Sequence, residues 1–159
     1  MDYERFLDAL QEGGWQVPNR SYATHNFEGK WQIAFIRLGG KFQAKGAVSF
    51  VICIRSTDMR NLNGEYTEFE KEPHAYPFKL TFEELRRGQF SYQCKLNNYE
   101  RSEIGMEDDW SGVLRAIKVT IPTWLGSYSA ETLAKQIREN GEDGYIEWIW
   151  LEDLESAPK

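Results

Sequence analysis

The apolar segment Ala47–Arg55 (AVSFVICIR) limits the folds open to this chain more than any other segment does. In a strand, successive side chains alternate between two faces, so Phe50 and Ile52 share one face and Val51 lies on the other. A strand that is apolar on both faces lies inside a sheet and is covered on both sides. We therefore expect a folded domain whose sheet has this segment as its central strand.

Neighbouring segments supply further strands. Ser21–Phe27 and Trp31–Leu38 precede the central strand at hairpin distance, which predicts an antiparallel meander. Apolar and polar residues alternate in Gln89–Leu96 and in Val113–Ile121, as in strands with one face in water. With a short strand at Glu65–Phe69, the sequence predicts a mainly antiparallel sheet of about five to seven strands.

Two helices are expected to pack on this sheet. Asp2–Glu12 has an apolar stripe and acids in its first turn, and two glycines end it. Ser129–Asn140 begins with a serine that suits a helix cap and ends before another glycine. Thr81 and Glu84 match a capping box, which indicates one or two helical turns after residue 81.

The last apolar segment, Tyr145–Leu151, fits two structures. Helical spacing fits Ile146, Ile149 and Trp150, whereas the preceding Asp143-Gly144 turn and the aromatic and β-branched content favour a strand. In a strand, Trp148 and Trp150 lie on the same side. No linker or repeat divides the chain, so we expect residues 1–159 to form a single α+β domain.

The composition indicates a folded, cytoplasmic protein. Of the 159 residues, 41% are hydrophobic and 14% aromatic, which is too much apolar material for a disordered chain. The cysteines, Cys53 and Cys94, fall in apolar strand-like runs, and we interpret both as reduced core residues. No run approaches the roughly 20 apolar residues of a membrane helix, and the charged first residues do not resemble a signal peptide.

The net charge of −6 is concentrated at the C-terminal end. Residues 1–138 contain 18 acids and 18 bases, whereas residues 139–159 contain seven acids and one base. This balance argues against general nucleic-acid binding, which needs a basic surface. The acidic segment instead suggests a surface that attracts a basic protein.

Motifs for the common chemistries are missing from the sequence. The chain has no glycine-rich phosphate loop, no Gly-x-Ser-x-Gly turn and no Cys-x-x-Cys or His-Glu-x-x-His signature. The two histidines, His25 and His74, are interpreted as ordinary strand and loop residues. We therefore assign no cofactor, no metal ligand and no catalytic residue, and an enzyme is the less favoured alternative.

Eight residues are candidate contacts for a partner. Trp110 lies in Asn97–Gly112, which we expect to be a long polar loop, and Trp124 also lies in a loop-like segment. A tryptophan in a loop either covers the core or anchors a contact with a partner. The other six lie in or beside the last apolar segment, where acids surround aromatic rings. The candidates are Trp110, Trp124, Glu142, Asp143, Trp148, Trp150, Glu152 and Asp153.

In layout, roughly the first 60 residues resemble the bacterial domain-of-unknown-function family 4304. The resemblance rests on Phe6-Leu7-Asp8-Ala9-Leu10 before Gly14-Trp15, on Trp31-Gln32-Ile33-Ala34, and on Phe50-Val51-Ile52-Cys53-Ile54. It implies a cytoplasmic bacterial α+β protein and supplies no catalytic residues.

Two functions fit these observations. The first is a non-enzymatic interaction module, such as an inhibitor or a toxin-neutralising partner, that presents an acidic, aromatic surface to a basic protein. The second is a small-molecule or carbohydrate-binding protein with an aromatic-lined cavity, either a binder alone or an enzyme that uses carboxylates. The charge asymmetry, the aromatic content and the missing catalytic motifs favour the first.

Overall fold

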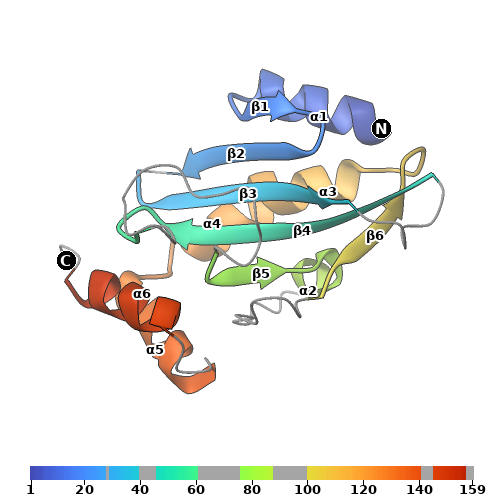
Figure 1. Cartoon of the computed structure of the whole chain (residues 1–159). Coiled ribbons are helices and arrows are strands. Elements are labelled where there is room, and N and C mark those ends of the chain that lie inside the picture. Colours follow the sequence, from blue (N-terminus) through green and yellow to red (C-terminus); the bar gives the residue numbers. More distant parts are fainter. Residues whose placement is uncertain (28, 40–45, 61–75, 88–99, 141–144, 157–159) are drawn as a thin grey trace.

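The computed structural model of the chain describes residues 1–27, 29–39, 46–60, 76–87, 100–140 and 145–156, with the backbone alone at 145–147. Figure 1 shows a twisted sheet with helices behind it and two further helices at one end. The elements in chain order are α1 (Tyr3–Glu12), β1 (Gln16–Asn19), β2 (Tyr22–Phe27), β3 (Trp31–Leu38), β4 (Ala47–Ser56), β5 (Phe78–Leu80), α2 (Phe82–Arg86), β6 (Ser102–Gly105), α3 (Ser111–Arg115), the π-helical turn η2 (Ala116–Thr120), α4 (Ile121–Leu125), α5 (Ala130–Asn140) and α6 (Tyr145–Glu155).

The sheet is antiparallel throughout its described strands, which confirms the predicted α+β class. Its order is β1-β2-β3-β4-β5, and β6 pairs with β4 beyond the end of β5. Strand β4 is the centre, because it pairs with β3 on one side and with both β5 and β6 on the other. The predicted meander and its central strand are confirmed.

Aromatic side chains join one face of the sheet to α1 and to the start of α3, and Figure 1 shows α3 and α4 behind the sheet. The rings of Phe35 and Phe50, on adjacent strands, have centroids 5.0 Å apart. Phe6 of α1 lies 5.1 Å from Phe35, and Trp110, just before α3, lies 5.2 Å from Phe50. Trp110 is fully buried, and its indole Nε1 donates to the carbonyl of Gly105 at 3.0 Å. This cluster fixes α1 and the start of α3 against the sheet.

The opposite face of β4 is also buried, and it carries cations. Val51 and Cys53 have no exposed surface, and burial raises the pKa of the Cys53 thiol to about 12. Arg55 donates to the side chain of Gln32 across the strand pair, and Lys79 Nζ donates to a backbone carbonyl at 2.7 Å. Cys53 is therefore a free core thiol, as the sequence predicts, and β4 is covered on both sides.

The predicted strand at Val113–Ile121 is wrong, because α3, η2 and α4 follow one another there without a break. Val113, Ile117 and Ile121 are spaced four residues apart, so they also form one face of a helix, and all three are buried. Val119, which a strand would place beside them, is 52% exposed. The helix therefore buries Val113, Ile117 and Ile121 and leaves Val119 exposed.

Pro122 lies in the first turn of α4. Proline has no N–H, and within a helix its ring clashes with the carbonyl four residues earlier. The π-helical turn η2 directly precedes α4. Because a π turn shifts the hydrogen bonding by one residue, it gives the proline room within a continuing helix.

Other helix predictions have mixed outcomes. The capping box of Thr81 and Glu84 is present, and so is the N-terminal helix, capped by Asp2. The strand favoured at Tyr145–Leu151 is wrong, because α6 covers that segment, and the expected loop at Asn97–Gly112 contains β6 and the start of α3. The predicted strands at 65–69 and 89–96, together with His74 and Cys94, lie outside the described residues.

The helical assignment of residues 111–125 predicts that two truncations change the free energy of unfolding by different amounts. Ile117→Ala removes a buried side chain and should lower the free energy of unfolding by about 2–5 kcal/mol. Val119→Ala should change it by no more than about 0.5 kcal/mol, because it trims an exposed side chain. Urea unfolding of both variants measures the difference, and equal losses would contradict the helix.

Candidate functional site

The helices α5 and α6 form a helical hairpin at the end of the sheet where β3 begins and β4 ends (Figure 1). Ser129 caps α5 as predicted, because its hydroxyl oxygen accepts from the backbone N–H of Thr132 at 3.1 Å. Apolar side chains on the inner sides of the two helices extend the core of the sheet. They are Leu133, Ala134, Ile137, Trp150 and Leu154.

One ion pair ties the hairpin to the turn that follows β4. The backbone N–H of Arg60 donates to the Asp153 carboxylate at 2.8 Å, and its side-chain Nε donates at 2.9 Å. The Asp153 side chain is only 4% exposed. Glu152 adds a longer contact to the same guanidinium at 3.3 Å, from a largely exposed position. Asp153 therefore has a structural role, which the sequence reading did not assign to it.

The predicted tryptophan contacts divide between core and surface. Trp110 and Trp150 have no exposed surface, so the core encloses both rings. Trp124 is half-buried and packs against Tyr128, with ring centroids 4.4 Å apart. Trp148 is 61% exposed, on the opposite side of α6 from Trp150. The prediction that Trp148 and Trp150 share one side is therefore wrong, because the segment is a helix.

Trp148, Leu151, Glu152 and Glu155 form a surface, here named the α6 outward face, on the other side of the helix from Trp150, with Leu151 at its edge packed partly against the core. These residues are spaced i, i+3, i+4 and i+7, so they lie along one side of the helix. Trp148, Glu152 and Glu155 are exposed, and Leu151 is half-buried. Surface helices normally carry polar residues on this side. Here the exposed side combines a large aromatic ring with carboxylates.

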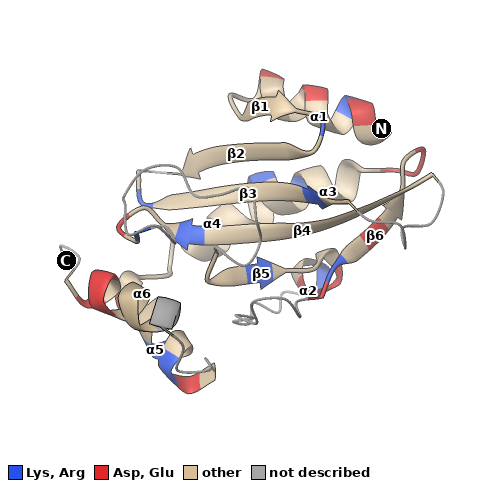
Figure 2. Ribbon diagram, in the orientation of Figure 1, with Lys and Arg blue, Asp and Glu red and all other residues tan. Residues whose placement is uncertain are grey.

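The acids of α6 give the hairpin a negative end (Figure 2). The helix contains four acids and no base, and three of the acids fall in its last turn. A helix C-terminus carries a partial negative charge, so acids there are unfavourable unless cations offset them. Arg60 pairs with Glu152 and Asp153, and Arg138 pairs with Glu155. The predicted contacts Glu142 and Asp143 lie outside the described residues.

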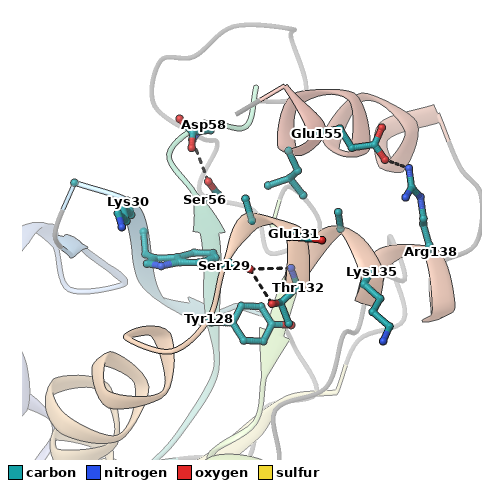
Figure 3. A pocket seen from close by; sticks show the side chains of 15 residues that line it. Lys30, Ser56, Asp58, Tyr128, Ser129, Glu131, Thr132, Lys135, Arg138 and Glu155 are labelled. Carbon is teal, nitrogen blue, oxygen red and sulfur yellow. Dashed lines mark hydrogen bonds and ion pairs between the residues drawn. The ribbon is translucent and has the colours of Figure 1, made fainter. Parts of the chain in front are cut away.

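A groove of about 1320 Å³ lies between the hairpin and the end of the sheet, here named the hairpin groove (Figure 3). The sheet contributes the turn at Gly29 and Lys30, and the end of β4 with Asp58. One side of α5 contributes Glu131, Ala134, Lys135 and Arg138, again at helical spacing. The other lining residues are Trp31, Ser56, Tyr128, Ser129, Ala130, Thr132, Leu154 and Glu155.

The charged side chains of the groove differ in whether they already have partners. Lys135 pairs with Glu139 at 3.9 Å, and Arg138 pairs with Glu155. Within the described part of the chain, no ion pair involves Lys30, Asp58 or Glu131. All three side chains are exposed to solvent. The groove therefore presents two carboxylates and one ammonium that are available to a ligand.

Tyr128 adds an unusual group to the wall of the groove. Its ring contacts Trp31 and Phe78, with centroids 6.1 and 5.8 Å away. Its hydroxyl is buried and has no hydrogen-bond partner among the described residues. Burial raises the pKa of this phenol to about 12. The aromatic ring therefore faces the groove while the hydroxyl stays neutral and enclosed.

In the part of the chain that the structure describes, the other histidine-, cysteine- and acid-based candidates for chemistry show no clustering. His25 stacks on Trp15, with ring centroids 5.4 Å apart. Among the described residues, no three His, Cys, Asp or Glu side chains gather as a metal site requires. No helix in the described ranges is long and apolar enough to cross a membrane.

Comparison with protein-family models, with curated proteins and with solved structures gives no match for this chain. The resemblance to family 4304 and the cytoplasmic location stay predictions from the sequence.

Sequence reasoning identified the acidic C-terminal segment but missed Arg60, Asp58 and Glu131. These residues lie outside any motif, and each meets its neighbours in the groove or the hairpin only through the fold. One signal was available for Glu131, because helical spacing places it on the same side of α5 as Lys135. Nothing in the sequence pairs Arg60 with Asp153, 93 positions away.

Removing either acid that binds Arg60 should show how the hairpin is held. Asp153→Ala leaves a half-buried guanidinium without its main acceptor, so we expect a loss of about 2–3 kcal/mol in unfolding free energy. Glu152→Ala removes an exposed partner and should cost about 1 kcal/mol or less. Chemical denaturation compares the two, and equal losses would argue against Asp153 as the anchor.

Replacing Tyr128 by phenylalanine should not destabilise the protein at neutral pH, because it removes a buried hydroxyl that has no hydrogen-bond partner. The folded state favours the neutral phenol, because its pKa is raised there. The contribution of this pKa difference to the free energy of unfolding is present below about pH 10 and is lost as pH rises towards about 12. Tyr128→Phe should therefore lose less stability than the wild type across that range. Denaturation at pH 9 and pH 11.5 measures this, and identical losses would contradict it.

Proposed function

We propose that this chain is a non-enzymatic interaction module that binds a basic protein through the α6 outward face. The observation that carries the proposal is the 61% exposure of Trp148 on a helix whose other side is buried. Burying a tryptophan on association removes a large apolar area from water, and tryptophan is enriched among the residues that dominate binding energy. An inhibitor or a toxin-neutralising protein is one such module.

Charge supports a basic partner rather than an acidic one. Glu152 and Glu155 lie about one and two turns after Trp148 along the outward face, and Figure 2 shows acids gathered on this helix. Arg60 and Arg138 offset part of this charge, but α6 contributes four acids against these two cations. The remaining negative potential would speed the approach of a basic protein and repel acidic ones.

Affinity purification with matched variants tests this proposal. The tagged protein, Trp148→Ala and Val119→Ala are each incubated with extract from the source cells, and bound proteins are identified by mass spectrometry. Val119 is the control, because it is another exposed apolar residue on a distant element. A basic protein retained by the wild type and by Val119→Ala, but lost with Trp148→Ala, is then purified.

Binding of that purified partner is measured by calorimetry at two salt concentrations. A central tryptophan contact predicts that Trp148→Ala raises Kd by about 30-fold or more, which corresponds to about 2 kcal/mol. Affinity should also fall as salt rises from low to physiological concentration. Equal affinity for the wild type and Trp148→Ala, or no dependence on salt, would contradict the proposed surface.

A further inference from the structure

The hairpin groove carries a second inference, which does not depend on the α6 outward face. Its available charges are two carboxylates, Asp58 from the sheet side and Glu131 from the α5 side (Figure 3), and one ammonium, Lys30. The other cations of the groove, Lys135 and Arg138, already pair with glutamates. The available charge is therefore net negative by one unit, and its two carboxylates come from different elements.

This arrangement suits a cationic side chain. Carboxylates on either side of a groove stabilise a cation between them, and aromatic rings attract cations through their faces. Trp31 and Tyr128 supply aromatic rings in the same lining. The ammonium of Lys30 can donate a hydrogen bond, so the ligand should also present a hydrogen-bond acceptor, such as a backbone carbonyl. A peptide with a lysine or arginine side chain offers both groups.

The size of the groove favours a peptide over a small amine. Sites for small molecules have volumes of about 300–1,000 Å³ and enclose most of the ligand. The hairpin groove, at about 1320 Å³, is larger than this range. We propose that it binds an extended peptide segment in which a lysine or arginine side chain lies between Asp58 and Glu131.

The two surfaces share only Glu155, so they can be tested separately. A segment of the partner proposed for the α6 outward face is one source of such a peptide. The groove itself requires only the peptide, whatever its source.

Nuclear magnetic resonance titration with blocked pentapeptides tests the groove. The probes are acetyl-Ala-Ala-Lys-Ala-Ala-amide and its arginine and glutamate counterparts, added to the full chain at low salt. We expect saturable shifts at the backbone amides of Gly29, Ser129 and Thr132 with the lysine and arginine peptides. The double variant Asp58→Asn/Glu131→Gln should raise Kd at least tenfold.

Matched variants separate the groove from general electrostatic attraction and from the first proposal. Asp58 and Glu131 are exposed and form no ion pair with other described residues, so the double variant should keep the wild-type spectrum elsewhere. Glu107→Gln together with Glu12→Gln makes the same charge change away from the groove and should leave Kd unchanged. Trp148→Ala should also leave it unchanged, even if the proposed partner is lost.

Three results would overturn the proposal. The first is equal binding of the glutamate peptide, and the second is an unchanged Kd in the double variant. The third is binding of 1,5-diaminopentane as tight as that of the lysine peptide, which would make the groove a site for small amines.

Discussion

Burial of β4 on both faces is the constraint on which the rest of this structure depends. One face needs the helices α1 and α3 to α4 behind it, where Phe35, Phe50 and Trp110 interlock. The other face encloses Val51, Cys53 and the cation of Arg55. Because β4 is packed on both faces, the position of its C-terminal end is fixed. The turn that follows carries Asp58 and Arg60, and this turn positions both the hairpin groove and the hairpin itself.

The helical hairpin combines stabilising and surface roles on opposite sides of α6. Its inner side places Trp150 and Leu154 in the core, and Asp153 binds Arg60. Its outer side exposes Trp148 next to carboxylates. Arg60 and Arg138 offset acids that would otherwise destabilise the C-terminal end of the helix. The same ion pairs that stabilise the hairpin thus limit, without removing, its negative charge.

The sequence predicted well where one pattern had one interpretation. The apolar runs of β3 and β4, the glycines after α1 and the capping box of Thr81 are local signals, and the structure contains each of these elements. Prediction failed where two periodicities coincided. Val113, Ile117 and Ile121 fit both an alternating strand and a helix face, and the apolar segment of α6 fits both as well. Local propensity could not separate these alternatives, because tertiary packing decides which surface is buried.

The sequence by itself determined the α+β class, the central strand, the reduced state expected of Cys53 and the acidic character of the last 21 residues. These follow from composition and from patterns within a few residues. Only the tertiary structure decided which tryptophans are exposed, which acids are already paired and that a groove exists. The physical reason is distance along the chain. Asp58 and Glu131, or Arg60 and Asp153, come close only because β4 and the hairpin pack together, and no local pattern encodes that contact.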